Sequence, residues 1–119
     1  MACEVEFTPE FEQWWNGLTS AQQGKIDAHV RLLEEYGPNL GFPYSSGVHG
    51  SRYPEMRELR VQSKGRPIRV LYAFDPRRTA ILLIGGDKTG QERWYERYVP
   101  EAETILERHL KKLKEENDG

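Results

Sequence analysis

The chain has 119 residues, enough for one domain with one hydrophobic core and too few for two. Charged residues make up 30% and aromatic residues 11%, so the chain is polar for a globular protein but too aromatic for a disordered one. Its single cysteine excludes an intramolecular disulfide and a cysteine-rich metal site. No segment resembles a signal peptide or a membrane span, so we expect a cytoplasmic protein without membrane contact.

The formal net charge of −2 is unevenly distributed along the chain. Residues 52–97 carry eleven Lys and Arg against six Asp and Glu, whereas the remaining residues carry six against thirteen. A basic middle segment between acidic ends predicts a positively charged surface that binds an anionic partner such as nucleic acid.

The first third of the chain predicts a short strand and a helical hairpin. Residues 3–7 alternate apolar and acidic side chains, which is typical of a strand. Thr8 and Pro9 then begin a helix, and Thr19 caps a second helix that continues to about Tyr36. Gly37-Pro38 ends that helix, because glycine favours a C-cap and proline cannot continue the helix.

The rest of the chain predicts a loop, an antiparallel meander and a final helix. Residues 37–54 are rich in Gly and Pro, which indicates a loop long enough for a functional role. Three strands follow at residues 56–62, 67–74 and 79–85. In the first, Leu59 and Val61 share a face expected to pack, and Glu58, Arg60 and Gln62 share a face expected to function. Pro100 begins the last helix, and residues 115–119 are expected to fray.

The common catalytic motifs are absent from this sequence. It contains no P-loop, no GxGxxG, HExxH, CxxC or GxSxG motif. The three histidines, His29, His49 and His109, lie in different predicted elements without metal-ligand spacing, so we expect no metal and no cofactor. His49, in the loop before Arg52, is the one histidine placed where a general base could act.

Cationic and aromatic residues are concentrated in the basic middle segment. They are Arg52, Arg57, Arg60, Lys64, Arg66, Arg69, Arg77, Arg78, Lys88, Arg93 and Arg97, with Tyr53, Tyr72, Trp94 and Tyr95. Guanidinium groups bind phosphates and aromatic rings stack on unpaired bases, so the pattern favours single-stranded RNA. The alternative is a solvated strand face whose arginines lie along apolar surface.

Four short motifs, taken in order, resemble one known family. They are Glu58-Leu59-Arg60-Val61, then Arg69-Val70-Leu71-Tyr72, then the apolar run 80–84 followed by Gly85-Gly86-Asp87-Lys88-Thr89, and last a helix led by Pro100. With the helical hairpin before them, they are similar to toxins of the RelE/ParE superfamily, nearest to its HigB and phage Gp49-like branch. The likeness covers about residues 3–113.

The resemblance implies a fold, an activity and a partner. The fold is an α+β RelE-like compact domain over residues 1–119, with an N-terminal strand and helical hairpin, an antiparallel β-meander and a C-terminal helix. The activity is that of a type II toxin: metal-independent, ribosome-dependent endonuclease cleavage of mRNA, which inhibits translation. The implied partners are the ribosome, mRNA and a helix-turn-helix antitoxin of the HigA kind, with DNA reached only through the antitoxin.

Site residues follow by position from the same resemblance. Arg60 and Arg69 match positions expected to clamp the scissile phosphate, and Lys88 matches a position for charge stabilisation or acid–base help. Structural alternatives are ion pairs for the two arginines and an ordinary turn for Lys88. Tyr95 is expected to stack on a base or donate a proton, or else to belong to the core, and Trp94 to pack beneath the last helix. The expected RNA-binding residues are drawn instead from the cations and aromatic residues of the basic middle segment, and they are Arg52, Arg57, Lys64, Arg66, Arg93 and Tyr95.

Two departures from the family pattern bear on the activity. Many ribosome-dependent toxins are strongly basic, whereas this chain has a net charge of −2. A catalytic His/Asp set near the C-terminus is also not reproduced, because His109 lies within the predicted final helix. A ParE-like gyrase inhibitor and a non-catalytic RNA-binding module therefore stand as alternatives to the nuclease.

Overall fold

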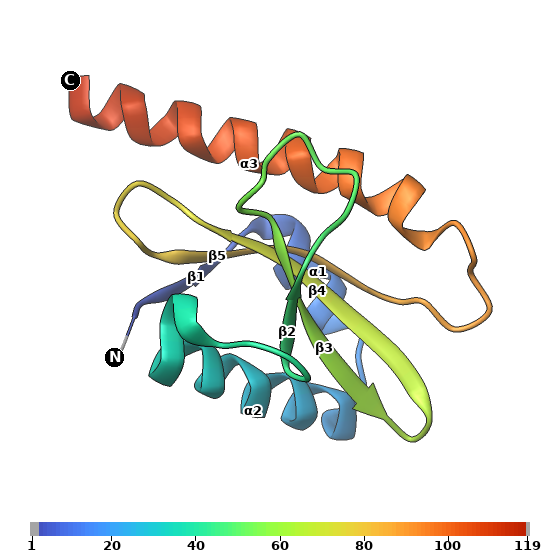
Figure 1. Ribbon diagram of the computed structural model, residues 1–119. Helices are drawn as coiled ribbons and strands as arrows, with labels where there is room; N and C mark the ends of the chain where they lie inside the picture. The colour runs from blue at the N-terminus through green and yellow to red at the C-terminus, as the bar shows by residue number, and fades with distance from the viewer. Residues whose placement is uncertain (1–2, 119) are drawn as a thin grey trace.

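The computed structural model describes residues 3–118. Its centre is a five-stranded sheet in the order β1-β5-β4-β3-β2 (Figure 1). The strands are β1 (Val5–Phe7), β2 (Ser45–Gly47), β3 (Arg57–Ser63), β4 (Arg66–Phe74) and β5 (Ala80–Asp87). β1 pairs with β5 in parallel and the other pairs are antiparallel. The predicted meander is confirmed, with strand ends within two residues of those expected.

The predicted helical hairpin is confirmed as α1 (Pro9–Asn16) and α2 (Ser20–Tyr36). The Thr8 hydroxyl accepts a hydrogen bond from the Phe11 amide at 3.1 Å and donates one to the Leu83 carbonyl at 2.6 Å, which ties the start of α1 to the sheet. Thr19 and Gln22 form a capping box at the start of α2. The short 3-10 helix η1 (Gly37–Asn39) follows α2 directly.

The tight β3–β4 turn sets the register on which the site depends. Lys64 and Gly65 adopt φ values of 51° and 78°, the conformation that two-residue hairpins require. With the turn at this position, Arg60 lies directly opposite Arg69 in the strand pair. Residues in register share a face of the sheet, so both guanidinium groups are placed on the same side.

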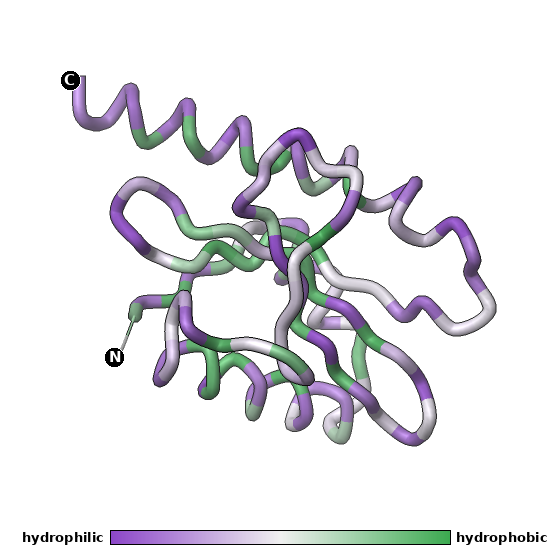
Figure 2. The backbone as a smooth tube through the Cα atoms, in the orientation of Figure 1, coloured by the Kyte–Doolittle hydropathy of each residue, from purple (hydrophilic) through white to green (hydrophobic). Residues whose placement is uncertain are grey.

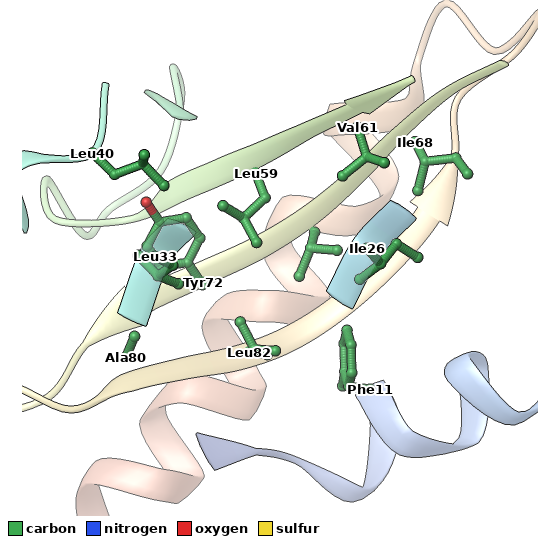
Figure 3. Packing of buried hydrophobic residues seen from close by; sticks show 11 residues of the cluster. Phe11, Ile26, Leu33, Leu40, Leu59, Val61, Ile68, Tyr72, Ala80 and Leu82 are labelled. Atoms are coloured by element: carbon green, nitrogen blue, oxygen red, sulfur yellow. The ribbon is translucent and has the colours of Figure 1, made fainter. Parts of the chain in front are cut away.

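Both faces of the sheet are packed. On one side α1 and α2 cover a core that includes Phe11, Ile26, Leu33, Leu59 and Tyr72 (Figure 3). On the other side α3 (Trp94–Asp118) covers a second core built on Met56, Leu71, Ala73, Ile81 and Leu83. Figure 1 shows α2 and α3 on opposite sides of the strands. The alternation expected for β3 is confirmed, because Leu59 and Val61 pack in the core under α1 and α2. Glu58 and Arg60 lie on the α3 side, where Glu58 is buried.

The last helix begins six residues before the predicted start at Pro100. Trp94, Val99, Ala102, Ile105 and Leu106 are buried at helical spacing, so they form one apolar stripe against the sheet. In Figure 2 hydrophobic positions recur along the side of α3 that faces the strands. This packing outweighs the one backbone hydrogen bond that Pro100 cannot donate. Residues 115–118, where we expected fraying, are helical, and Gly119 lies outside the described residues.

The loop 37–54 contains an edge strand that the sequence did not predict. β2 pairs with β3 through Ser45↔Leu59 and Ser46↔Glu58. The Ser45 hydroxyl shares a 2.6 Å hydrogen bond with the Tyr72 hydroxyl, so the edge strand is attached to the core by a side chain. The run Ser-Ser-Gly has little strand propensity of its own, and this tertiary contact decides its conformation.

Two adjacent glycines let tryptophans pack closely on opposite faces of β5. A Cβ at Gly85 would lie 2.2 Å from the Trp14 ring, and one at Gly86 would lie 2.8 Å from Trp94 Nε1. We expect Gly85→Ala to lower the free energy of unfolding by about 1–3 kcal/mol, because the Trp14 ring must shift within a packed core. Urea titration monitored by tryptophan fluorescence measures this change.

Gly24 provides the matched control. A Cβ at Gly24 meets nothing within 4 Å, and this residue lies within α2, so Gly24→Ala should raise stability by roughly 1 kcal/mol or less. Equal stabilities for Gly85→Ala and the wild type would contradict the close approach of Trp14.

Over residues 3–118, the structure contains no helix with the length and apolarity of a membrane span.

Candidate active site

Five side chains meet on the α3 side of the sheet, and we call them the Glu58 cluster: Glu58, Arg60, Arg69, Lys88 and Tyr95. Glu58 is 4% exposed and lies at the centre. Its Oε1 accepts a 2.6 Å hydrogen bond from the Tyr95 hydroxyl and lies 3.4 Å from Arg69 Nε. Its Oε2 lies 3.4 Å from Arg60 Nη1 and accepts a 3.0 Å hydrogen bond from the Ser46 hydroxyl. One buried carboxylate thus holds groups from β2, β3, β4 and α3.

Arg69 forms the buried base of the cluster. It is 6% exposed, and Nη1 donates a 3.1 Å hydrogen bond to the Ile68 carbonyl. Its Nε contacts Glu58 at 3.4 Å but has no hydrogen-bond partner with acceptable geometry among residues 3–118. A buried cationic donor without a hydrogen bond is costly, so Arg69 retains the capacity to stabilise an additional anion nearby.

Lys88 lies just beyond β5, where its amide donates to the Pro67 carbonyl at 2.9 Å and continues the strand pairing. Its Nζ is 5.0 Å from the centroid of the Tyr95 ring, a cation–π distance. Burial lowers the pKa of Lys88, and the charges of Arg69 and Arg60 lower it further against the opposing effect of Glu58. An ammonium group with a lowered pKa is a better proton donor near neutral pH.

Tyr95 lies in the first turn of α3 and completes the cluster. Burial, together with the hydrogen bond to Glu58, raises the pKa of Tyr95 to about 12. The phenol therefore stays protonated in the physiological range and acts as a hydrogen-bond donor. The sequence singled out Tyr95 but not its partner, because the acceptor Glu58 is 37 residues earlier in the chain and reaches Tyr95 only through the fold.

Two of the expected RNA-binding arginines lie outside this cluster. Arg57 is on the opposite face of the sheet, where its Nε donates to the Ser45 hydroxyl at 3.2 Å and its Nη2 to the Leu40 carbonyl at 3.4 Å. Alternation along β3 turns it away from Arg60, so Arg57 is not part of the same surface. Arg52 pairs with Glu103 and Glu107 and fastens the loop before β3 to α3.

The other expected RNA-binding cations also lie outside the cluster. Lys64 and Arg66 are exposed at the end of the β3–β4 hairpin, and Arg66 pairs with Asp87 at 3.1 Å. Arg93 is exposed immediately before α3 and lies 3.9 Å from Glu96. The structure thus brings Arg60, Arg69, Lys88 and Tyr95 together and gives Arg52, Arg57, Arg66 and Arg93 other partners.

The histidines occupy three separate places. His29 lies on α2, and His49 is exposed in the loop before β3. His109 Nε2 lies 3.0 Å from an oxygen of the buried Asp75, at the end of β4 opposite to the Glu58 cluster. A His/Asp pair therefore exists in this chain, although away from the basic cluster. Trp94 is 1% exposed, which confirms its packing role, although it is the first residue of α3 and does not lie beneath the helix.

The Glu58 cluster has the composition of an oxyanion-binding site. Arg60 and Arg69 both contact the Glu58 carboxylate, and Lys88 lies against the Tyr95 ring, so the cluster has a local excess of positive charge. Arg60 and Lys88 are partly exposed, whereas Arg69 and Glu58 are buried beneath them. A phosphate can approach Arg60 and Lys88 from solvent, while Arg69 contributes its charge from a region of low dielectric constant.

The lowered pKa of Lys88 has a consequence for stability. We expect Lys88→Gln to raise the free energy of unfolding at pH 7 by up to about 1 kcal/mol, because it removes a charge that burial and the repulsion by Arg69 and Arg60 disfavour. As pH rises toward 10.5, the ordinary pKa of lysine, the folded wild type loses the Lys88 proton at a lower pH than the unfolded chain does. The free energy of unfolding of the wild type therefore rises relative to that of the variant over this range. Denaturant titrations from pH 7 to 10 measure both effects.

Lys25→Gln is the matched control for this comparison. It removes the same charge from the exposed surface of α2 and should leave stability within about 0.5 kcal/mol of the wild type. A Lys88→Gln variant that is less stable than the wild type at pH 7 would show that Lys88 makes a net favourable contact.

Solved structures of known proteins share this arrangement of elements. The isolated RelE toxin of Escherichia coli superposes with a TM-score of 0.61 at 17% sequence identity, covering 80% of this chain and 94% of RelE. The toxin–antitoxin complex RelBE2 of Mycobacterium tuberculosis contains a chain that superposes with a TM-score of 0.57 at 13% identity, covering 73% of this chain and 99% of that one. The protein thus has the RelE fold.

Sequence comparison specifies the family. The model of the phage-derived Gp49-like proteins (DUF891) matches residues 13–107, and the chain belongs to this family. Two proteins of Mycobacterium tuberculosis (strain ATCC 25618 / H37Rv) that are named as toxins are close in sequence. HigB3 is 42% identical over 107 residues, covering 89% of this chain and 92% of HigB3. HigB2 is 40% identical over 111 residues, and this chain spans only 55% of its length. The resemblance inferred from the four motifs is confirmed.

Proposed function

We propose that this protein is the toxin of a type II toxin–antitoxin system and cleaves mRNA on the ribosome. The observation that carries the proposal is the convergence of Arg60 and Arg69 on the Glu58 carboxylate. Lys88 joins them from a third segment of the chain by lying against the ring of Tyr95, which donates to the same carboxylate. The family relationship to proteins named as HigB toxins supports the same conclusion.

The residues of the cluster suit two of the tasks that RNA cleavage requires. The 2′-hydroxyl releases its proton to water as its oxygen attacks the adjacent phosphorus. Negative charge then develops on the phosphate oxygens, and preorganised cations stabilise it. Arg60 would contact these oxygens with its planar guanidinium group, and the charge of the buried Arg69 would add to the stabilisation. The bond from phosphorus to the 5′-oxygen then breaks, and Lys88, with its lowered pKa, would supply the proton to that oxygen.

Glu58 and Tyr95 act as positioning residues in this scheme. Glu58 is buried and already accepts hydrogen bonds from Tyr95 and Ser46, so it orients the two arginines without contacting the substrate. Tyr95 remains protonated and fixes the carboxylate. These contacts hold the cations in place before the substrate arrives, which is the preorganisation that electrostatic catalysis needs.

The proposed partner is a helix-turn-helix antitoxin of the HigA kind. An antitoxin that carries acidic groups would neutralise the Glu58 cluster by covering it, since the cluster has excess positive charge and partly exposed cations. The similarity of the fold to a toxin chain solved with its antitoxin supports such a complex.

Induction of the protein in growing cells tests the target. Incorporation of labelled amino acids and plasmid supercoiling are measured at short intervals after induction. We expect protein synthesis to fail first, with supercoiling unchanged during the same interval. Loss of supercoiling before any loss of protein synthesis would identify a gyrase inhibitor instead.

A further inference from the structure

Phe42 is exposed on a turn that holds its backbone firmly. Its side chain is 76% exposed, the largest fraction among the large hydrophobic residues of the described chain. The amides of Tyr44 and Ser45 both donate to the Gly41 carbonyl at 3.0 Å, and Leu40 and Ser45 on either side are buried. The turn is therefore anchored at both ends, while the Phe42 ring contributes nothing to either core.

The ring lies beside the Glu58 cluster. The guanidinium carbon of Arg60 is 5.1 Å from the centroid of the Phe42 ring, and Nη1 of the same group is 3.4 Å from Glu58 Oε2. The Arg60 amide also donates to the Tyr44 carbonyl at 2.8 Å, which ties the turn to β3. Arg60 thus contacts an exposed aromatic ring and the carboxylate that organises the phosphate site.

We propose that Phe42 is a stacking platform for a nucleobase of the bound RNA, next to the phosphate held by Arg60 and Lys88. The inference rests on the proposed function, because it assigns the base-binding part of the same site. Base–aromatic stacking is typical of single-stranded RNA recognition, and the π-face of every base permits it. The guanidinium of Arg60 orients the ring by a cation–π contact and leaves the rest of the ring open to solvent.

A protein contact is the competing use of an exposed phenylalanine. A stable protein interface buries about 800 Å² on each partner and is centred on an apolar patch. Phe42 is instead placed against the charged group of Arg60, and the nearby exposed ring of Tyr44 is directed toward His29 of α2. An exposed ring beside a cationic cluster suits a nucleotide, because the ring can stack on the base while the cations bind the phosphate.

Binding to programmed ribosomes tests the proposal. The mRNA carries 2′-methoxy groups in the A-site codon to prevent cleavage, and one base of that codon at a time is replaced by an abasic residue. We expect the wild type to lose roughly five- to hundredfold in affinity at one codon position, the range of a single base–aromatic stack. Phe42→Ala should bind the intact and abasic messages equally, and Phe42→Trp should restore the difference.

Phe7→Ala is the matched control, because Phe7 is also exposed, at 58%, but lies on β1 at the opposite edge of the sheet. It should behave as the wild type. If Phe42→Ala retains the abasic effect or binds as tightly as the wild type, Phe42 is not the platform, and a loss of antitoxin affinity alone would assign the ring to a protein contact. If Arg60→Ala also binds as the wild type, the phosphate site itself is refuted and the proposed function fails with it.

Discussion

Replacing Glu58 by Gln is expected to lower the free energy of unfolding by about 3–5 kcal/mol, the largest stability effect that we predict at one position. The substitution preserves the shape of the side chain but removes the carboxylate that, within residues 3–118, pairs with both Arg60 and Arg69. Arg69 is 6% exposed and cannot regain full hydration, so its charge would be left uncompensated. Urea titration at pH 7 measures the loss.

A double variant separates electrostatics from packing. Lys88→Gln combined with Glu58→Gln removes one of the cations left without a carboxylate. The double variant should therefore be more stable than the sum of the two single effects on the free energy of unfolding would give. Added sulfate should also stabilise Glu58→Gln more than the wild type, because an anion can take the place of the carboxylate. A Glu58→Gln protein as stable as the wild type would contradict the central role of Glu58.

Replacing Arg60 by Ala is expected to reduce RNA cleavage by about 10²–10³-fold, the largest activity effect that we predict. Arg60 is the partly exposed guanidinium of the cluster, and its loss removes direct stabilisation of charge on the phosphate. Glu58 keeps its contacts with Arg69, Tyr95 and Ser46, so stability should fall by only about 1 kcal/mol. Growth arrest and the rate of message loss after induction provide the measurement.

Arg31→Ala is the control for the change in charge. Arg31 is exposed on α2, on the other side of the sheet, and pairs with Asp27 one turn earlier. It should retain full toxicity. Equal toxicity of Arg60→Ala and Arg31→Ala at equal protein levels would show that Arg60 does not act on the substrate.

Much of the fold followed from local sequence signals. Thr8, Thr19 and Gly37 bounded the helical hairpin because capping chemistry acts within a few residues. Lys64-Gly65 marked the β3–β4 turn for the same reason. β2 and the first six residues of α3 were not predictable in this way, because pairing with β3 and burial of Trp94 stabilise them through contacts made only after folding.

The candidate site was anticipated in part, through residues that belong to short motifs and that the structure brings together. Arg60, Arg69 and Lys88 were identified by the family resemblance, and the register of β3 with β4 shows why the first two meet. Glu58 was placed on the same face but not recognised as the organising carboxylate. Its burial depends on α3 covering that face, and no pattern within β3 carries this information.

Mapping of transcript 5′-ends shortly after induction of the wild type and of Arg60→Ala tests the central claim most directly. We predict new 5′-ends within translated codons for the wild type, in phase with the reading frame, and their loss in the variant at equal protein levels. Intact messages in growth-arrested wild-type cells, or the same new ends in both strains, would contradict the assignment of the Glu58 cluster as the site of mRNA cleavage.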